Sequence, residues 1–288
     1  MIGSAFVLLW CTGYPAGKIA LGHSAPFTLL GMRFGAAGLL YAALAVSAHA
    51  SWPRGRIAWH SAMVGALSLA LQFGGVYLGI ALGANVGIAA LMIGTMPIAT
   101  ALLSLLFGEP VRGQQWFGFA FGFAGVALVV GDRLDPGTAG IGAYVALLIG
   151  LLGISAGTLY QKRYGSDVDL RAGLTLQNLS ATLLLLPLAL FEGFRMDASP
   201  ALFASLSWLI LINSMGGFAL LFLLLRRGAA TEVATLFFLM PPVAATMNFL
   251  VLGENLSAFK LAGFALAAFG VYLATRHDKT LVSAQCET

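Results

Sequence analysis

The sequence predicts an all-α integral membrane protein of ten transmembrane helices, built as two five-helix repeats of which the second is inverted. The composition, the spacing of apolar runs and an internal repeat carry this prediction. Of the 288 residues, 59% are apolar and only 9% are charged. A soluble domain carries about 25% charged residues. We therefore expect lipid rather than water to be the solvent of this chain.

Apolar runs separated by polar or Gly/Pro-rich segments define the individual spans. Each run comes close to the roughly 20 residues that a helix needs to cross a bilayer. Backbone polar groups in lipid must be satisfied within the segment, and the runs lack the two-residue alternation of a membrane barrel, so helices are expected. The predicted spans are 2–21, 27–48, 58–80, 85–107, 115–131, 138–160, 171–191, 203–225, 230–252 and 258–275.

The basic residues predict the orientation. If both termini are cytoplasmic, ten of the 15 Lys and Arg residues fall in inner connections or the C-terminal tail, three in outer connections, and Lys18 and Arg33 within spans. This bias follows the positive-inside rule, so we expect a multi-pass protein of the bacterial inner membrane. The inner residues are Arg54, Arg56, Arg112, Lys162, Arg163, Arg171, Arg226, Arg227, Arg276 and Lys279, and the outer ones are Arg133, Arg195 and Lys260.

An internal repeat is the most informative feature. Residues 97–128 align without gaps with 242–273 at an offset of 145, which pairs Gly108-Glu109 with Gly253-Glu254. Because each repeat holds five spans, an odd number, the second repeat enters the membrane from the opposite side. Inverted repeats around a central site are typical of transporters. The expected units are residues 1–134, residues 135–276 and a polar cytoplasmic tail, 277–288.

The paired repeats also carry a family resemblance. Trp10-x-x-Gly13 and Lys18 in the first span, Arg33-Phe34 in the second, and Pro followed by Gly-Glu in the fourth and ninth resemble the EamA-type drug/metabolite transporter superfamily. Within it the chain is most similar to the YddG-like amino-acid exporters. The resemblance implies ten helices, a cavity lined mainly by helices 1, 3, 4, 6, 8 and 9, and export of amino acids or similar metabolites across the inner membrane.

Candidate substrate-binding residues come from polar, aromatic and methionine side chains within the spans. Trp10 and Tyr14 share one face of the first helix, and Pro15 leaves the carbonyl of Cys11 without a helical donor. Polar groups facing lipid are costly, so those within spans are expected to face protein or the cavity. Methionine suits a pocket for differently shaped side chains, although packing explains these positions equally simply. The predicted binding residues are Trp10, Tyr14, Gln72, Tyr77, Met92, Met96, Asn213 and Met240.

Prolines and charged residues near span ends suggest moving parts. Pro15, Pro97, Pro241 and Pro242 are expected to kink the first, fourth and ninth helices. The repeat also places Lys18 with Glu254 on the outside and Lys162 with Glu109 on the inside, which suggests alternate ion-pair latches. The alternative is that these lysines only extend toward the headgroups.

Arg33 in the second helix is expected to support structure or a gate, because the resemblance puts that helix at the edge of the cavity. An arginine within a span implies a partner or a water path.

An enzyme is the main rival class, and the sequence argues against it. Gly153 to Gly157 matches a nucleophile elbow around Ser155 but lies in an apolar helical run instead of a strand–turn–helix. Gly13 to Lys18 resembles a phosphate-binding loop with the wrong spacing. No cofactor, metal or nucleic acid is expected, and the sequence leaves open a monomer or a homodimer.

The predicted function is therefore export of amino acids, aromatic and other apolar ones included, by alternating access without ATP hydrolysis. The alternative is an exporter of other small metabolites or drugs, either proton-coupled or of the nucleotide-sugar or phosphate-ester type. Proton coupling commonly uses a carboxylate within a span, whereas Glu109, Glu232 and Glu254 lie near predicted helix ends.

Overall fold

A computed structural model of the chain describes residues 2–105, 113–131, 139–164, 168–226, 240–253 and 257–275. Helices are the regular elements of these residues, joined by one isolated bridge between Ser24 and Met196. A helix or a run of consecutive helices lies in each of the ten predicted ranges. In chain order these are α1 (Ile2–Cys11) with α2 (Gly13–Leu21), α3 (Pro26–Ser47), α4 (Gly55–Gly65) with η1 (Ala66–Leu71) and α5 (Gln72–Ala81), α6 (Val86–Gly94) with α7 (Met96–Ser104), α8 (Gly113–Gly131), α9 (Ile141–Tyr164), α10 (Leu170–Phe191), α11 (Pro200–Trp208) with η3 (Leu209–Gly217) and α12 (Phe218–Arg226), α14 (Met240–Leu252) and α15 (Ala258–Thr275).

Five of these helices are long and apolar enough to cross a membrane, and a sixth span results if the bent pair α6–α7 is taken as one. The other described helices are shorter or less apolar, so ten crossings remain a prediction. The qualifying segments are Pro26–Ser47, Gly55–Ala81, Ile141–Tyr164, Leu170–Phe191 and Pro200–Leu221.

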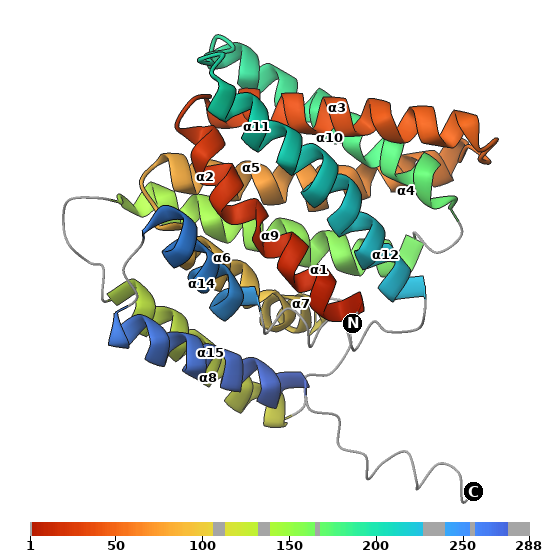
Figure 1. Cartoon of the computed structure of the whole chain (residues 1–288). Coiled ribbons are helices and arrows are strands. Elements are labelled where there is room, and N and C mark those ends of the chain that lie inside the picture. The colour runs from red at the N-terminus through yellow and green to blue at the C-terminus, as the bar shows by residue number, and fades with distance from the viewer. Residues whose placement is uncertain are drawn as a thin grey trace, which may run out of the picture.

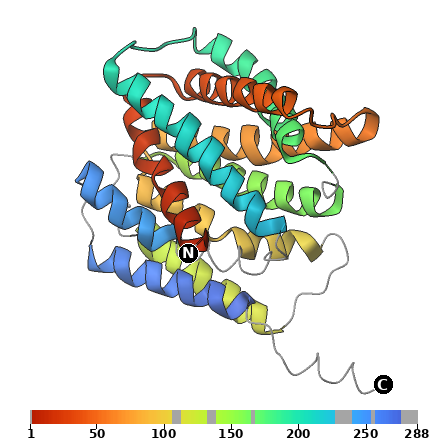
Figure 2. The same cartoon turned by 45° about the vertical axis from the view of Figure 1, so that its right-hand side comes forward.

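The helices pack in layers, with α3 beside α10 on one side and α8 beside α15 on the other (Figures 1 and 2). Between these pairs, α1 and α2 cross the centre next to α11, η3 and α12, while α5 packs on α9. The centre of the molecule therefore brings together segments from both halves of the sequence.

Glycines allow the closest of these contacts. A Cβ added to Gly125 would lie 2.7 Å from the carbonyl of Gly263, and one added to Gly270 would lie 2.6 Å from the carbonyl of Gly118. Since the later residue of α8 meets the earlier residue of α15, the two helices run antiparallel. A Gly-x-x-x-Gly spacing, such as Gly118/Gly122 in α8, allows this close backbone approach.

Two helices break where the sequence predicts kinks. The first span is interrupted at Thr12, whose hydroxyl donates to the carbonyl of Leu9 at 2.6 Å. The fourth is interrupted at Thr95, with a bend of 41° between the two flanking helices. Pro15 and Pro97 follow these breaks by two or three residues, and each lacks the N–H that would continue the helical pattern.

The remaining predicted kink is in the ninth span. Pro241 and Pro242 are the second and third described residues of α14 (Met240–Leu252). Residues 227–239, where a bend before these prolines would occur, lie outside the described residues.

Two π-helices interrupt the third and eighth spans. Segment η1 lies directly before Gln72, and η3 contains Asn213 and Ser214. π-Helical turns are rare and frequently occur at functional sites, because their wider pairing leaves backbone carbonyls open to other donors. A glycine pair lies at the corresponding place in each of these spans, Gly74-Gly75 in the third and Gly216-Gly217 in the eighth.

Candidate functional site

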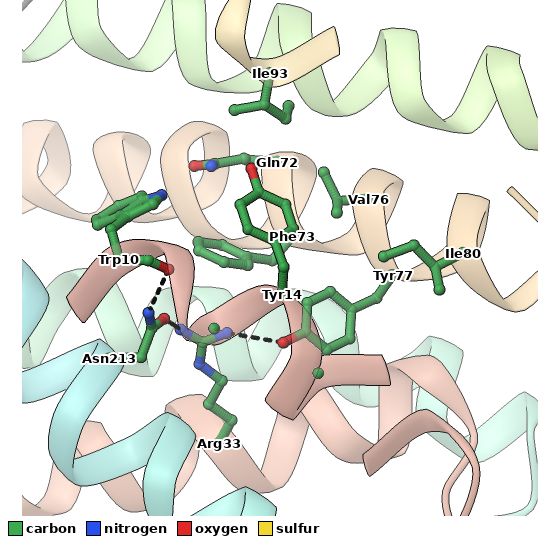
Figure 3. A pocket seen from close by; sticks show the side chains of 12 residues that line it. Trp10, Tyr14, Arg33, Gln72, Phe73, Val76, Tyr77, Ile80, Ile93 and Asn213 are labelled. Carbon is green, nitrogen blue, oxygen red and sulfur yellow. Dashed lines mark hydrogen bonds between the residues drawn. The ribbon is translucent and has the colours of Figure 1, made fainter. Parts of the chain in front are cut away.

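A pocket lies at the centre of the bundle, between α1, α2, α3, α5, α6 and η3 (Figure 3). It contains about 420 Å³ of empty space, part of which is open to solvent. Its lining combines aromatic rings with a few polar groups, the composition usual for a small-molecule site. The lining residues are Trp10, Gly13, Tyr14, Gly17, Arg33, Gln72, Phe73, Val76, Tyr77, Ile80, Ile93 and Asn213.

Arg33 holds the polar part of this pocket together. Its guanidinium is completely buried and donates from Nε to Ser214 Oγ at 3.0 Å, from Nη1 to the Tyr77 hydroxyl at 3.2 Å and from Nη2 to Asn213 Oδ1 at 2.5 Å. The guanidinium carbon lies 4.5 Å from the centroid of the Phe73 ring, which adds a cation–π contact. All three acceptors are neutral, so the network orients the charge without neutralising it.

Asn213 connects this network to the break in the first span. Its side-chain Nδ2 donates to the carbonyls of Leu9 at 3.2 Å and Trp10 at 3.0 Å. The interruption at Thr12 leaves these carbonyls available, because an unbroken helix would use them internally. One amide side chain therefore joins the broken helix to the arginine.

A second side chain of α3, Tyr41, also contacts the π-helix η3. The Tyr41 hydroxyl lies 3.1 Å from the Ser214 carbonyl oxygen and 3.2 Å from that of Met215. Arg33 and Tyr41 are eight residues apart on α3, so both project from the same side of that helix toward η3. The two side chains together fix Asn213 and Ser214 in place.

Two glycines of α2 make space for the network. A Cβ on Gly13 would lie 2.6 Å from Asn213 Nδ2, and a Cβ on Gly17 would lie 2.6 Å from the Tyr77 hydroxyl. Any larger residue would displace one of the groups that contact Arg33. The Gly13/Gly17 spacing thus has a local role in this pocket.

Aromatic rings form the walls. Trp10 packs between Phe6 and Phe218, with ring centroids 5.4 and 5.1 Å away. Phe73 packs on Phe34 at 5.6 Å. These rings are held by neighbours outside the pocket, so the walls are preformed.

Gln72 differs from the other polar residues of the lining. Its side chain is 3% exposed, and its Oε1 is buried without a hydrogen-bond partner in the described part of the chain. In Figure 3 Gln72 lies on the opposite side of the pocket from Arg33, with the rings of Tyr14 and Phe73 between them. An unpartnered buried acceptor is costly and often marks a place where a ligand or water binds.

The structure brings together five of the eight predicted binding residues: Trp10, Tyr14, Gln72, Tyr77 and Asn213. The three methionines lie outside this lining. Met96 and Met240 are buried in the core, and Met92 packs against it. The carbonyl of Met240 accepts a hydrogen bond from the Cys11 thiol at 3.6 Å, which joins α14 to α1.

The predicted latches cannot be followed in full. Lys18 and Lys162 are exposed, whereas Glu109 and Glu254 lie outside the described residues. Ser155, the residue of the elbow-like sequence, is completely buried in α9, where its hydroxyl donates to the carbonyl of Met96 at 3.4 Å.

The sequence analysis did not place Arg33 or Phe73 in the pocket. The resemblance assigned the second helix to the cavity's edge, but the length of the arginine side chain carries its charge inward. An arginine inside an apolar run was itself the available signal. Its partners were not apparent, because Asn213 and Ser214 are about 180 residues away in the chain.

A helical bundle with several membrane-length apolar helices around a polar and aromatic pocket is the architecture of a membrane transporter. The chain belongs to the EamA-like transporter family, whose sequence profile matches twice, over residues 1–131 and 141–276. The family resemblance noted from the sequence is thereby confirmed.

Individual relatives cover nearly the whole chain. The uncharacterized inner membrane transporter YedA of Escherichia coli strain K12 is 28% identical, covering 96% of this chain and 90% of YedA. The uncharacterized transporter YvbV of Bacillus subtilis is 27% identical, covering 95% and 90%. A probable amino-acid metabolite efflux pump of Salmonella typhimurium is 26% identical, covering 93% and 91%.

A solved crystal structure has the same fold. It superposes with a TM-score of 0.68 at 19% sequence identity and covers 100% of this chain and 98% of the other.

Proposed function

We propose that this protein exports amino acids across the bacterial inner membrane by alternating access through the central pocket, without ATP hydrolysis. Ten spans form two inverted five-helix repeats, and both termini are cytoplasmic. The single observation that carries the proposal is the buried pocket, in which aromatic rings and hydrogen-bonding groups from several helices converge. Such a lining suits a small solute with both an apolar part and polar groups.

The packing of equivalent helices supports an inverted repeat. At the repeat offset of 145, Gly118 corresponds to Gly263 and Gly125 to Gly270. Gly125 approaches Gly263 and Gly270 approaches Gly118, so the α8–α15 contact is repeated with the two helices exchanged. Antiparallel packing of equivalent helices is what a two-fold axis in the membrane plane requires.

The same relation extends to the other helices. α3 packs on its counterpart α10, and α6 packs on α14. The contact between α4 and α9 matches that between α11 and α2, which relates the third and sixth spans to the eighth and first. Two halves related in this way can exchange conformations and so open the pocket to either side in turn.

The amino-acid assignment has support from the relatives and from the charge of the pocket. Two relatives are named probable amino-acid metabolite efflux pumps, at 26% and 25% identity. A carrier of phosphate esters needs several cations, and Arg33 is the one cationic side chain among the described residues of the lining. Lys18, the nearest alternative in sequence, is exposed.

Flux measurements with purified protein in liposomes test the proposal. Labelled amino acids, phosphorylated sugars and cationic drugs are offered separately, with and without a pH gradient. We expect saturable amino-acid flux that needs no pH gradient. Tyr14→Ala should raise the KM, whereas Tyr144→Ala, which changes a partly buried tyrosine outside the lining, should not.

Two results would contradict this proposal. Flux of phosphate esters alone would refute the amino-acid assignment while leaving the fold intact, and accumulation that depends on a pH gradient would favour proton coupling. Separately, cysteines placed at positions 109 and 254 should be labelled from opposite sides of the membrane. Labelling from the same side would refute the inverted repeat.

A further inference from the structure

We infer that Arg33 is the binding site for a substrate carboxylate. The inference rests on the proposed function and narrows it, since it requires the exported amino acid to carry a free carboxylate. Arg33 would then both organise the pocket and recognise the solute.

The charge of Arg33 has no counter-ion in the described part of the chain. A buried guanidinium is stable only when it is paired or fully hydrogen-bonded. The described carboxylates are all engaged elsewhere. Asp169 pairs with Arg171, Asp197 pairs with His23, and Glu192 accepts hydrogen bonds at the start of α3. A substrate carboxylate would supply the missing charge.

The guanidinium also has donors to spare. It carries five N–H groups. Three hydrogen bonds to described residues are made, one each from Nε, Nη1 and Nη2. Two N–H groups, one on each terminal nitrogen, therefore have no acceptor in the described part of the chain. A carboxylate can accept from both terminal nitrogens of a guanidinium, and such charge-assisted bonds are the stronger kind.

The neutral partners prepare Arg33 for this role. Asn213, Ser214 and Tyr77 fix the plane of the guanidinium, and the ring of Phe73 supports it 4.5 Å from the guanidinium carbon. An acidic partner in the same place would have satisfied the charge and made a substrate anion unnecessary. Neutral acceptors hold the side chain in position and leave its charge available.

The rings next to Arg33 suit the rest of an amino acid. Figure 3 shows Tyr14 and Phe73 between Arg33 and Gln72. The ammonium group and the side chain of an α-amino acid are both bonded to the carbon next to the carboxylate. A side chain that extends away from Arg33 would therefore contact these rings.

Binding of three related compounds to the detergent-solubilised full chain tests the inference. L-Phenylalanine has both charged groups, 3-phenylpropionate lacks the ammonium and phenethylamine lacks the carboxylate. Dissociation constants from calorimetry should be about 10- to 100-fold weaker for phenethylamine than for phenylalanine, the range expected for loss of a charged hydrogen-bonded contact.

Variants of Arg33 separate recognition from folding. Arg33→Gln should reduce the preference for phenylalanine over phenethylamine to about one. Arg33→Lys keeps the buried charge but loses the paired donors, and it should weaken phenylalanine binding about tenfold while phenethylamine binding is unchanged. Arg56→Gln, the same change at an exposed arginine of α4, is the matched control and should behave as the unaltered chain.

Each outcome decides the matter. Equal binding of phenethylamine and phenylalanine, an unchanged preference in Arg33→Lys, or no binding of any of the three by the unaltered chain overturns the inference. Arg33-dependent carboxylate binding without flux in liposomes would refute the proposed transport and leave the site standing. Amino-acid flux that is unchanged by the Arg33 substitutions would support the proposed transport and refute the carboxylate site. 3-Phenylpropionate keeps the carboxylate, so Arg33→Gln should weaken its binding as it does that of phenylalanine; unchanged binding of 3-phenylpropionate refutes the carboxylate contact.

Discussion

Replacement of Gly13 by alanine provides the sharpest test of the polar network. The new methyl group would lie 2.6 Å from Nδ2 and 2.9 Å from Cγ of Asn213. Normal carbon contacts begin near 3.4 Å, so the asparagine must move. It would then lose its hydrogen bonds to the carbonyls of Leu9 and Trp10 and to Arg33.

The expected cost follows from these bonds. Hydrogen bonds between membrane helices contribute about 0.6 kcal/mol each on average, so three of them amount to about 2 kcal/mol. Overpacking of a filled interior costs a similar amount, about 1–3 kcal/mol. We therefore expect Gly13→Ala to lower the free energy of unfolding by about 2 kcal/mol and to weaken substrate binding, because Arg33 loses one of its positioning partners.

The assay is a double-mutant cycle, with unfolding followed in mixed detergent micelles. Gly31→Ala is the control for glycine replacement itself, since nothing lies within 4 Å of a Cβ at that position of α3. In an Asn213→Ala background the clash disappears, and Gly13→Ala should then cost nearly nothing. Equal costs of Gly13→Ala in both backgrounds, or the same stability as Gly31→Ala, would refute the reasoning.

Three further predictions concern other parts of the fold. Gly125→Ala and Gly270→Ala should each reduce the folded fraction after solubilisation, measured by size-exclusion chromatography, because their methyl groups would meet the partner helix backbone; an undiminished folded fraction would contradict the close approach. Tyr41→Phe should lower the free energy of unfolding by about 1 kcal/mol, because the phenolic hydroxyl no longer hydrogen-bonds η3; unchanged thermal melting would exclude this. The hydrogen bonds from Arg171 hold the pKa of the Asp169 carboxyl below its ordinary value, so its contribution to stability should be complete near neutral pH and lost as the pH falls through that lowered pKa. Asp169→Asn should remove this part of the pH dependence of melting, and an identical pH profile in the variant would count against it.

The sequence was sufficient to place the helices because lipid imposes simple rules. An apolar run long enough to span must be helical, and helices occupy each predicted range. The breaks near Pro15 and Pro97 followed from the missing N–H groups. The place of five residues in the pocket lining was also predictable in part, since a glutamine, an asparagine or a tyrosine within an apolar run is expected to face protein rather than lipid.

The remaining features depend on contacts between distant segments. Two carbonyls of the π-helix η3 accept a hydrogen bond from Tyr41 on another helix, and no local pattern announces that partner. The directions of the methionine side chains were not predictable for a similar reason. Met92 and Met96 flank the break at Thr95, so their direction depends on how the two short helices rotate there. Periodicity along a continuous helix cannot predict that rotation.

Asn213 connects the pocket arginine to the break in the first span, so we expect it to couple substrate binding to movement. Its Oδ1 accepts from Arg33, while its Nδ2 donates to two carbonyls at the break between α1 and α2. Under the proposed alternating access, any movement of the first span relative to η3 must stretch or exchange these same hydrogen bonds. A carboxylate bound to Arg33 would change the electrostatic environment of Asn213 Oδ1. It can favour one arrangement of the first span and η3 over the other only if it binds the two arrangements with different affinities. Asn213→Ala should therefore separate the two events: carboxylate binding at Arg33 is weakened but retained, while flux falls further than binding does. Equal losses of binding and flux would show that Asn213 serves recognition alone.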